Sequence, residues 1–180
     1  PHLHPPPPPA TPTSRCSSAA SDVYKRQAFY EFNCTAIELS VDEDTGHITI
    51  HKHIIVGDTG KSLHPLQVAG QDEGAAIMGL GHTLMEHMIY GDDGRIRNLG
   101  AIDYRIPTSM DLPELMQSAA IENADGPGPY GAKGVSEGGL LSVQSAVGSA
   151  VAQATGVVIR DLPLTPEHVW RSLRDARSND

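Results

Sequence analysis

The sequence predicts an α+β fold in which a β-hairpin and several helices form mixed layers. Residues 28–56 alternate apolar and polar side chains on both sides of a short turn, which is typical of a hairpin. Residues 66–90 and 140–155 are rich in apolar or small side chains, as expected of partly buried helices. With 39% hydrophobic residues, the 180-residue chain can bury one modest core, and no internal repeat is visible.

The predicted hairpin turns at Asp42–Gly46, between FYEFNCTAIELSV and HITIHKHIIV. Cys34 lies among apolar residues of the first strand, so we expect an inert buried thiol. His51 and His53 are two residues apart on the second strand, and strand alternation therefore places them on one face. A zinc site is the alternative, but their spacing matches no recognised ligand pattern, and surface or core histidines are favoured.

The segment Leu66–Tyr90 predicts one long helix, because apolar residues recur every three or four positions from Ile77 onward. Its four glycines each weaken the helix by up to about 1 kcal/mol relative to Ala. These are Gly70, Gly74, Gly79 and Gly81. So many glycines indicate a close neighbour, either packed chain or a ligand, and the sequence alone favours packing. His82, Glu86 and His87 of this segment have no zinc-ligand spacing.

A turn at Gly91–Gly94 and a long loop follow this helix, because prolines in the next stretch exclude a continuous helix. Asp103 and Tyr104 lie in this loop, either as anchors through side-chain hydrogen bonds or with a direct catalytic role. Residues 115–121 fit a strand or a helix equally well. Residues 126–139, which hold six glycines and two prolines, must be loop.

The C-terminal part predicts a helix, a strand and a second helix. Leu140–Thr155 is a helix able to pack closely, and it should end at Gly156. Residues 157–164, VVIRDLPL, predict a short strand. Thr165 as the N-cap, followed by Pro166, predicts the start of a terminal helix.

The overall charge of −9, from 13 Lys and Arg against 22 Asp and Glu, argues against nucleic acid or anionic lipid as a partner. No apolar run approaches the roughly 20 residues needed to cross a bilayer. Two cysteines do not build a disulfide framework, and the sequence lacks a secretory signal pattern. We therefore expect a cytoplasmic protein without a membrane span.

Residues 1–27 differ in character from the rest of the chain. They hold seven of the 14 prolines and almost no aliphatic side chains, so we expect disorder and no contribution to the core. SSAASDVYKRQ, residues 17–27, resembles the translation of a sequencing-library transposon adapter at all of its codons. We therefore interpret residues 1–27 as an artefact of sequence assembly and residues 28–180 as the genuine domain. A proline-rich recruitment tail is the alternative reading.

The loop GPYGAKGVSEGGLL, Gly128–Leu141, is the segment most suited to chemistry. A glycine-rich stretch before a helix offers free backbone N–H groups that favour anionic ligands. It also brings Lys133 and Glu137 together, although Lys133 lacks the Ser or Thr of a nucleotide-binding Walker motif. Glu137 can act as a general base if burial raises its pKa, whereas a purely structural connection is the commoner use of such a loop.

Four separated blocks resemble the molybdenum hydroxylases, the xanthine dehydrogenase and aldehyde oxidase family, in the C-terminal part of the large subunit. The resemblance runs from about Thr35 to Val169, in the family's order and spacing. The blocks are VAGQDEGAAIMGLGHTLME, DYRIPTSMDLPE, GPYGAKGVSEGG and ATGVVIRDLPLTPEHV. Two departures are Ser136, where glycine is commonest, and His64, which replaces the usual Asn in the segment Gly57–Pro65.

This resemblance implies a molybdopterin cofactor, often as the cytosine dinucleotide, whose molybdenum is held by the pterin dithiolene. No protein side chain is then expected to bind the metal. By position, Glu137 matches the family's catalytic glutamate, which accepts a proton while the substrate is hydroxylated with oxygen from water. The residues matched to cofactor binding are Gln71, Lys133, Gly134, Val135 and Ser136.

The resemblance further implies a fragment of an oxidoreductase subunit that acts on an aldehyde, an N-heterocycle or a related small substrate. Its partners would be the missing N-terminal part of the same subunit, and iron–sulfur and FAD subunits or domains in a dimer of heterotrimers. The isolated fragment is then expected to be inactive. The alternative is a non-catalytic packing or assembly domain that retains the fold.

Overall fold

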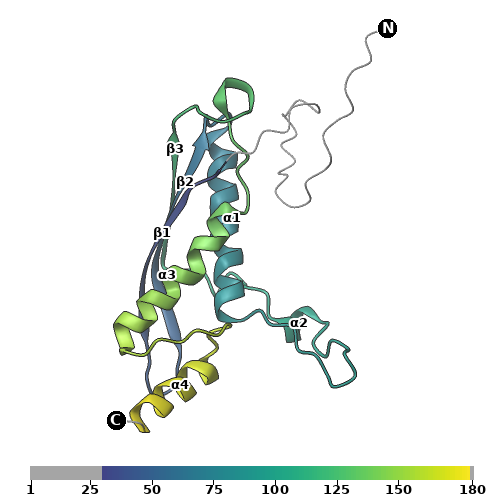
Figure 1. Cartoon of the computed structure of the whole chain (residues 1–180), viewed down its shortest axis with the longest axis vertical. Helices are drawn as coiled ribbons and strands as arrows, with labels where there is room; N and C mark the ends of the chain where they lie inside the picture. The colour runs from purple at the N-terminus through teal and green to yellow at the C-terminus, as the bar shows by residue number, and fades with distance from the viewer. Residues whose placement is uncertain (1–29, 179–180) are drawn as a thin grey trace.

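The computed structural model describes residues 30–178, so the expectations for residues 1–27 lie outside the described part of the chain. A three-stranded sheet carries its two longest helices on one face (Figure 1). The elements are β1 (Asn33–Val41), β2 (Ile48–Gly60), α1 (Pro65–Leu84), α2 (Ala101–Tyr104), β3 (Leu115–Glu122), the 3-10 turn η1 (Pro129–Gly131), α3 (Gly138–Thr155) and α4 (Pro166–Ser178). The predicted α+β class with mixed layers is confirmed.

The predicted hairpin forms β1 and β2, which pair antiparallel around the turn at Asp42–Gly46. Residues 115–121, which fitted either a strand or a helix, form β3. β3 pairs parallel with β2, so the strand order is β1-β2-β3. The parallel pairing requires a long crossover, which α1 and the following loop provide.

A β-bulge separates the two histidines of β2, so the prediction that they share a face was wrong. The register passes from Lys52 opposite Glu38 to Ile50 opposite Leu39, leaving His51 as the extra residue. His51 contacts Ser40, whose side chain is exposed on the open face, whereas His53 is fully buried. Burial lowers the pKa of His53, and neither ring nitrogen has a hydrogen-bond partner among the described residues.

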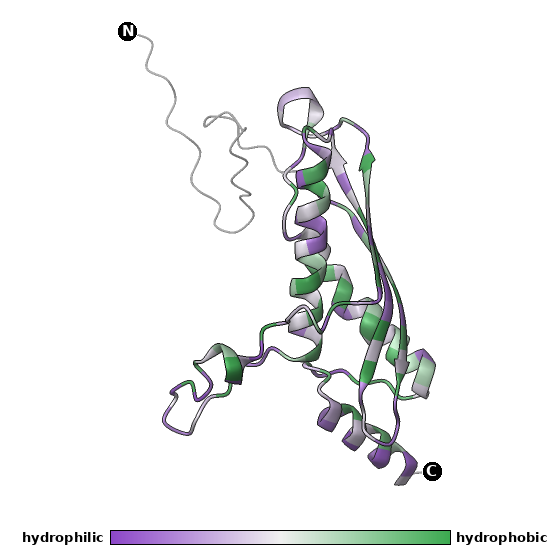
Figure 2. Ribbon diagram, turned by 180° about the vertical axis from the view of Figure 1, so that it is seen from behind, coloured by the Kyte–Doolittle hydropathy of each residue, from purple (hydrophilic) through white to green (hydrophobic). Residues whose placement is uncertain are grey.

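Cys34 is exposed, which corrects the expectation of a buried thiol. Along β1 the odd-numbered positions face the helices, and the even-numbered ones, including Cys34, face away from them. Figure 2 shows α1 and α3 on one side of the sheet, so the even-numbered side chains of β1 lie on the face that no described helix covers.

The first helix is shorter than predicted. α1 begins at Pro65 and ends at Leu84, because Met85 leaves the helical conformation and the N–H groups of Met85 and Glu86 both donate to the carbonyl of Gly81. Of its glycines, Gly79 lies against Val143 of α3, as simple packing predicted. Gly70 and Gly74 face open space, so no described neighbour accounts for them.

The two C-terminal helices follow the local signals of the sequence. α3 begins at Gly138, two residues earlier than predicted, and ends at Gly156 in the left-handed conformation. The Thr165 hydroxyl accepts a hydrogen bond from the N–H of His168 at 3.3 Å, which confirms it as the N-cap of α4.

The predicted strand at residues 157–164 was wrong, because this segment has no strand conformation. A strand needs a neighbour that takes up its backbone hydrogen bonds. The N–H of Leu164 instead donates to Thr83 at the end of α1, at 2.7 Å. The segment is therefore an irregular connection between α3 and α4, and it is bonded to the end of α1 just before α4 begins.

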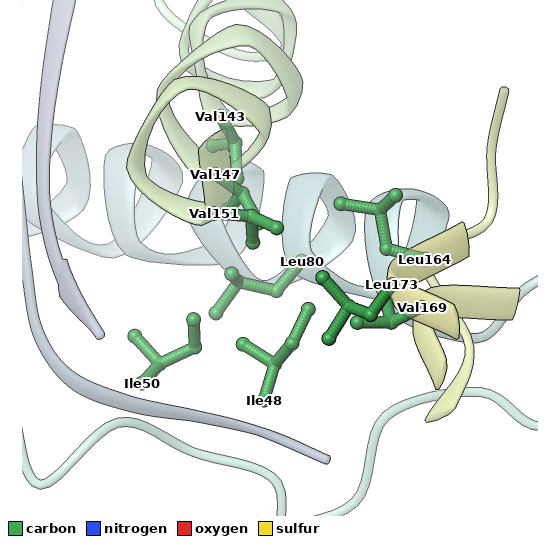
Figure 3. Packing of buried hydrophobic residues seen from close by; sticks show 9 residues of the cluster. All are labelled: Ile48, Ile50, Leu80, Val143, Val147, Val151, Leu164, Val169 and Leu173. Carbon is green, nitrogen blue, oxygen red and sulfur yellow. The ribbon is translucent and has the colours of Figure 1, made fainter. Parts of the chain in front are cut away.

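The core lies between β2 and the helices α1, α3 and α4 (Figure 3). Ile48 and Ile50 of β2 face Leu80 of α1 and a row of valines of α3. Leu164 and two residues of α4 complete the cluster. Its buried members are Ile48, Ile50, Leu80, Val143, Val147, Val151, Leu164, Val169 and Leu173.

An arm between α1 and β3 extends away from the sheet and carries α2 (Figure 1). Tyr104 of α2 interacts with Glu86, and this hydrogen bond raises the pKa of the tyrosine. Tyr104 is thus tied to the base of the arm, as expected of a loop anchor. Asp103 is exposed, and its N–H donates to the carbonyl of Gly100.

Candidate functional site

The glycine loop is fixed to the end of β2 by backbone hydrogen bonds. The N–H of Lys133 donates to Thr59 at 3.0 Å, and the N–H of Lys61 donates to Gly131 at 3.1 Å. On the other side of the loop, the N–H of Ala124 donates to Gly60 at 3.1 Å. Gly60 has a φ of +63°, and a Cβ there would lie 2.2 Å from the carbonyl oxygen of Gly131. Only glycine permits this approach.

The ammonium group of Lys133 lies inside the protein, between two carboxylates. Its Nζ is 2.5 Å from Oδ2 of Asp58 and 2.8 Å from Oδ1 of Asp125. The side chains of Lys133 and Asp58 are only 4% and 8% exposed, whereas Asp125 is 61% exposed. Hydrogen bonds with Asp125 and Asp58 raise the pKa of Lys133. Burial is the largest single influence on Asp58 and opposes its ionisation. The charge of Lys133 and the hydrogen bonds from Lys133, the N–H of Gly60 and Asn123 together outweigh burial and lower the pKa of that carboxyl.

Three of the five residues expected to bind cofactor line one hollow of about 220 Å³. Gln71 of α1 meets Lys133 and Val135 of the glycine loop there. The full lining is Lys61, Leu63, His64, Gln67, Val68, Gln71, Ala132, Lys133 and Val135. Gly134 and Ser136, the other two expected residues, are neighbours in the loop but do not line this hollow.

His64 takes over the capping role that an Asn performs well at the start of a helix. It is the N-cap of α1, and its Nδ1 accepts a hydrogen bond from the N–H of Gln67 at 3.2 Å. A neutral ring that accepts at Nδ1 carries its proton on Nε2, and His64 is also one of the residues that line the hollow. The substitution of Asn by His therefore preserves the start of α1.

Glu137 is the N-cap residue of α3, and its side chain is exposed. It makes no capping hydrogen bond with its side chain, and Ser136 beside it is also exposed. Residues 30–178 therefore do not bury this carboxylate. What the loop does provide is a carboxylate held at a helix terminus and open to a ligand.

A cluster of buried polar groups, absent from the sequence predictions, lies between β1, β2 and α1. It comprises Glu31, Asn33 and Asp72, which together hold five of the eight buried side-chain atoms without a hydrogen-bond partner in the described chain. A Cβ on Gly57 would lie within 3.3 Å of both Asn33 and Asp72, so these side chains converge over that glycine. Burial raises the pKa values of Glu31 and Asp72, and neighbouring carboxylates add to this effect.

Replacing Asp72 with Asn should stabilise the fold at neutral pH by on the order of 1 kcal/mol, because a buried unpaired carboxylate is costly. A raised pKa means that the folded chain holds this proton more tightly than the unfolded chain. The stabilising effect of the proton is complete below the ordinary pKa of about 4 and is lost as the pH rises. Urea unfolding at about pH 3 and pH 7 should therefore show a gain only at the higher pH.

Glu73→Gln is the matched control for this prediction, because Glu73 is the next residue of α1 and is exposed. Its gain should be much smaller than that of Asp72→Asn. An equal gain for Asp72→Asn at both pH values would show that the carboxylate charge is not the cause.

The histidines give no indication of a protein-bound metal. Within residues 30–178, no group of three or more His, Cys, Asp or Glu side chains could hold a metal ion. His82 is engaged with Gln144 of α3, whose side-chain nitrogen lies 2.8 Å from Nδ1. None of the helices in this part of the chain combines the length and apolarity needed to cross a bilayer.

Asp58 and Asp125 are functional candidates that the residue-by-residue reading missed. Asp58 belongs to the segment Gly57–Pro65, which was singled out for its resemblance to a family block, so a signal existed for it. Asp125 was not singled out from the sequence, although its partner Lys133 lies in the same loop region. The convergence of Asp72 with Glu31 and Asn33 gave no local signal, because Asp72 is remote from them in sequence.

Similarity to known proteins agrees with this geometry. Residues 12–113 match the family described as molybdopterin cofactor-binding domain. The putative xanthine dehydrogenase molybdenum-binding subunit XdhA of Escherichia coli (strain K12) is 40% identical over 140 residues, 77% of this chain and 18% of that subunit. An aligned stretch of this length necessarily includes Glu137, whereas the family match ends before the glycine loop.

Two solved structures have the same fold. Quinoline 2-oxidoreductase from Pseudomonas putida 86 is 33% identical, with a TM-score of 0.69 over 75% of this chain and 17% of that chain. Aldehyde oxidoreductase from Desulfovibrio gigas is 29% identical, with a TM-score of 0.72 over 80% of this chain and 15% of that chain.

The α+β scaffold and these similarities define a cofactor-binding domain of oxidoreductases. The chain belongs to the molybdopterin cofactor-binding domain family. It spans less than a fifth of the length of the relatives described above. The family match also begins inside residues 1–27, so it includes part of the segment interpreted as an artefact.

Proposed function

We propose that this chain is part of the molybdopterin-binding subunit of a molybdenum-dependent hydroxylase or dehydrogenase. The observation that carries the proposal is the hollow in which Gln71, Lys133 and Val135 meet, in a chain of the molybdopterin cofactor-binding family. Gln71 comes from α1 and is remote in sequence from Lys133 and Val135, which are neighbours in the glycine loop. Their convergence at one place supports the roles expected for them.

The residues around the hollow fit a polar cofactor with anionic groups. Gln71 is exposed and offers an amide, and the first turn of α1 beside it supplies the positive end of a helix dipole. In this proposal the loop residues Lys133, Gly134, Val135 and Ser136 hold the cofactor together with Gln71, through peptide groups other than the N–H of Lys133, which donates to Thr59. The bound cofactor supplies the redox chemistry through its molybdenum.

Glu137 acts as the general base in this proposal. Its exposed carboxylate follows the cofactor-binding residues directly, so a substrate bound at the cofactor lies within reach of the loop that carries it. The carboxylate accepts a proton as the substrate is hydroxylated with oxygen from water. An exposed side chain without a capping bond is free to adopt the required orientation.

A non-catalytic packing or assembly domain is the second candidate. The observation in its favour is that residues 30–178 leave Glu137 exposed and do not bury it as a general base would require. In the leading proposal, this burial comes from segments of the subunit outside the present chain.

The substrate class, the form of the cofactor and the partners are proposed from the enzymes that resemble this chain. The substrate is an aldehyde or an N-heterocycle, in line with the quinoline, xanthine and aldehyde enzymes that resemble this chain. The cofactor is the cytosine dinucleotide form. Electrons pass to iron–sulfur and FAD groups on partner subunits or domains of a cytoplasmic dimer of heterotrimers.

Metal and pterin analysis of the purified protein tests the proposal. The complete subunit should contain molybdenum and pterin in equal amounts, whereas the 180-residue chain alone should retain little of either and show no turnover. The reason is that most of the subunit length of the relatives lies outside the stretch matched here. A folded, complete subunit without molybdenum would refute the proposal, and stoichiometric molybdenum in the isolated chain would refute the expected dependence on other segments.

A further inference from the structure

We infer that Lys133 is a positioning residue for Glu137, acting through its ion pairs with Asp58 and Asp125. The inference rests on the proposed function of Glu137. It gives the Lys133 side chain a different task from its peptide group, which belongs to the cofactor-binding loop. The ammonium fixes where the loop lies, and the loop determines where Glu137 is presented.

The ammonium of Lys133 already forms two ion pairs within the protein. Asp58 and Asp125 approach its Nζ at 2.5 Å and 2.8 Å, and the side chain is 4% exposed. Reaching a phosphate in the hollow would require this group to leave both carboxylates. The Lys133 side chain is therefore an internal link, and not a cation offered to the ligand.

The link joins a rigid element to a loop. Asp58 lies in β2 and is held by further hydrogen bonds, from the N–H of Gly60 and from Asn123. Lys133 and Asp125 lie on the two sides of η1, so both arms of the glycine loop are tied to one point of the sheet. Only three residues separate Lys133 from Glu137, which leaves little freedom between the anchor and the carboxylate.

A buried ion pair is suited to specifying position. Burying two charges costs desolvation energy that their attraction only partly recovers, so such a pair contributes little net stability. The ion pair does, however, raise the free energy of any loop conformation in which one of the two buried charges loses its partner. With an apolar residue at position 133 the loop could adopt several positions of similar free energy. The buried ion pair favours one of them.

Amide hydrogen exchange in the 180-residue chain tests the link without any cofactor. In Lys133→Met, the amides of Lys61, Ala124 and Lys133 should exchange about tenfold faster or more, because they bond across the junction of loop and sheet. Amides of α3 from Val143 to Val151 should be unchanged. Unchanged exchange at the junction in a folded variant would overturn the inference.

Two further variants keep this test decisive. Lys52→Met is the matched control, because Lys52 forms an exposed ion pair with Glu38 on the sheet and should leave the junction unaffected. The double variant Asp58→Asn with Lys133→Met removes both charges, so it should fold even if the single variant does not. It should still show faster exchange at the junction, and normal exchange there would also overturn the inference.

Kinetics of the complete, cofactor-loaded subunit test the effect on Glu137. Lys133→Met should lower kcat per bound molybdenum by about 10²-fold, as expected when a catalytic group is displaced by about 1 Å, with KM unchanged. Lys133→Arg keeps the charge and should recover a large part of kcat. A kcat equal to wild type, or an equal loss in Lys133→Arg, would refute the positioning role.

The two proposals fail in different ways. If the junction loosens in Lys133→Met but Glu137→Gln retains full turnover, the link exists and the proposed role of Glu137 is wrong. If Glu137→Gln is inactive but the junction and kcat do not respond to Lys133→Met, the role of Glu137 stands and the positioning inference is wrong.

Discussion

Replacing Glu137 with Gln should reduce turnover of the complete molybdenum-binding subunit by about 10³-fold or more, within the range lost when a general base is removed. Gln keeps the shape of the side chain but does not accept the proton. Because Glu137 is exposed and makes no capping bond with its side chain, the change should not disturb α3. Molybdenum and pterin content should therefore remain those of the wild type.

The measurement is steady-state kcat together with metal and pterin analysis of the same preparation. Glu167→Gln is a suitable control, since Glu167 is an exposed glutamate in the first turn of α4 and lies outside the site. It should leave turnover unchanged. Full turnover in Glu137→Gln would discard the general-base proposal and favour a packing or assembly domain. A loss that tracks a loss of molybdenum would assign Glu137 to cofactor retention.

Replacing Gly79 with Ala should destabilise the fold by about 1–3 kcal/mol, the usual effect of overpacking a tight contact. The added Cβ would lie 2.6 Å from Cγ2 of Val143 and 3.1 Å from the carbonyl oxygen of Leu140. Val143 is fully buried, so α1 and α3 must move apart to accommodate the methyl group. Urea unfolding of the 180-residue chain measures the change in free energy.

Gly74→Ala on the same helix gives the opposite expectation. A Cβ at this position would meet no atom within 4 Å, so the change keeps every contact of the wild type. It should stabilise the chain by about 0.5–1 kcal/mol, because Ala loses less backbone entropy in a helix than Gly. If both variants shift stability in the same direction, close packing of α1 on α3 is not the reason for Gly79.

The elements that the sequence predicted well are those with local signals. Gly156 ends α3 because glycine adopts the left-handed conformation at a helix end, and Thr165 starts α4 through its own hydroxyl. The hairpin follows from alternation around a turn at Asp42–Gly46. Each of these signals acts between residues that are close in sequence, so a pattern in the chain is sufficient to read it.

The errors arise where a remote contact overrides the local pattern. The bulge at His51 separates it from His53, although strict alternation places the two on one face. Cys34 has apolar neighbours in sequence but points to the face of the sheet that no described helix covers. Residues 157–164 have strand-like composition, but Leu164 bonds to the end of α1 and no strand forms.

Some features of the candidate site were predicted from the sequence, and others are visible only in the structure. The positions of Glu137, Gln71 and the glycine loop were found through resemblance, and the structure brings Gln71, Lys133 and Val135 to one hollow. That the Lys133 ammonium is buried against Asp58, 75 residues earlier in the chain, had no counterpart in the local sequence. The resemblance suggested a loop that cradles the cofactor, and the structure adds how that loop is held.

The sequence by itself determined the α+β class, the hairpin, the end of α3, the start of α4 and the likeness to molybdenum hydroxylases. Side-chain periodicity predicts the class and the hairpin, capping residues predict the helix ends, and ordered blocks of residues carry the likeness. Tertiary structure alone decided that residues 115–122 form a strand parallel to β2, that Glu31, Asn33 and Asp72 converge, and that Lys133 is locked to Asp58. The physical reason is that pairing, burial and desolvation depend on groups brought together from distant parts of the chain, and no local pattern specifies which groups those are.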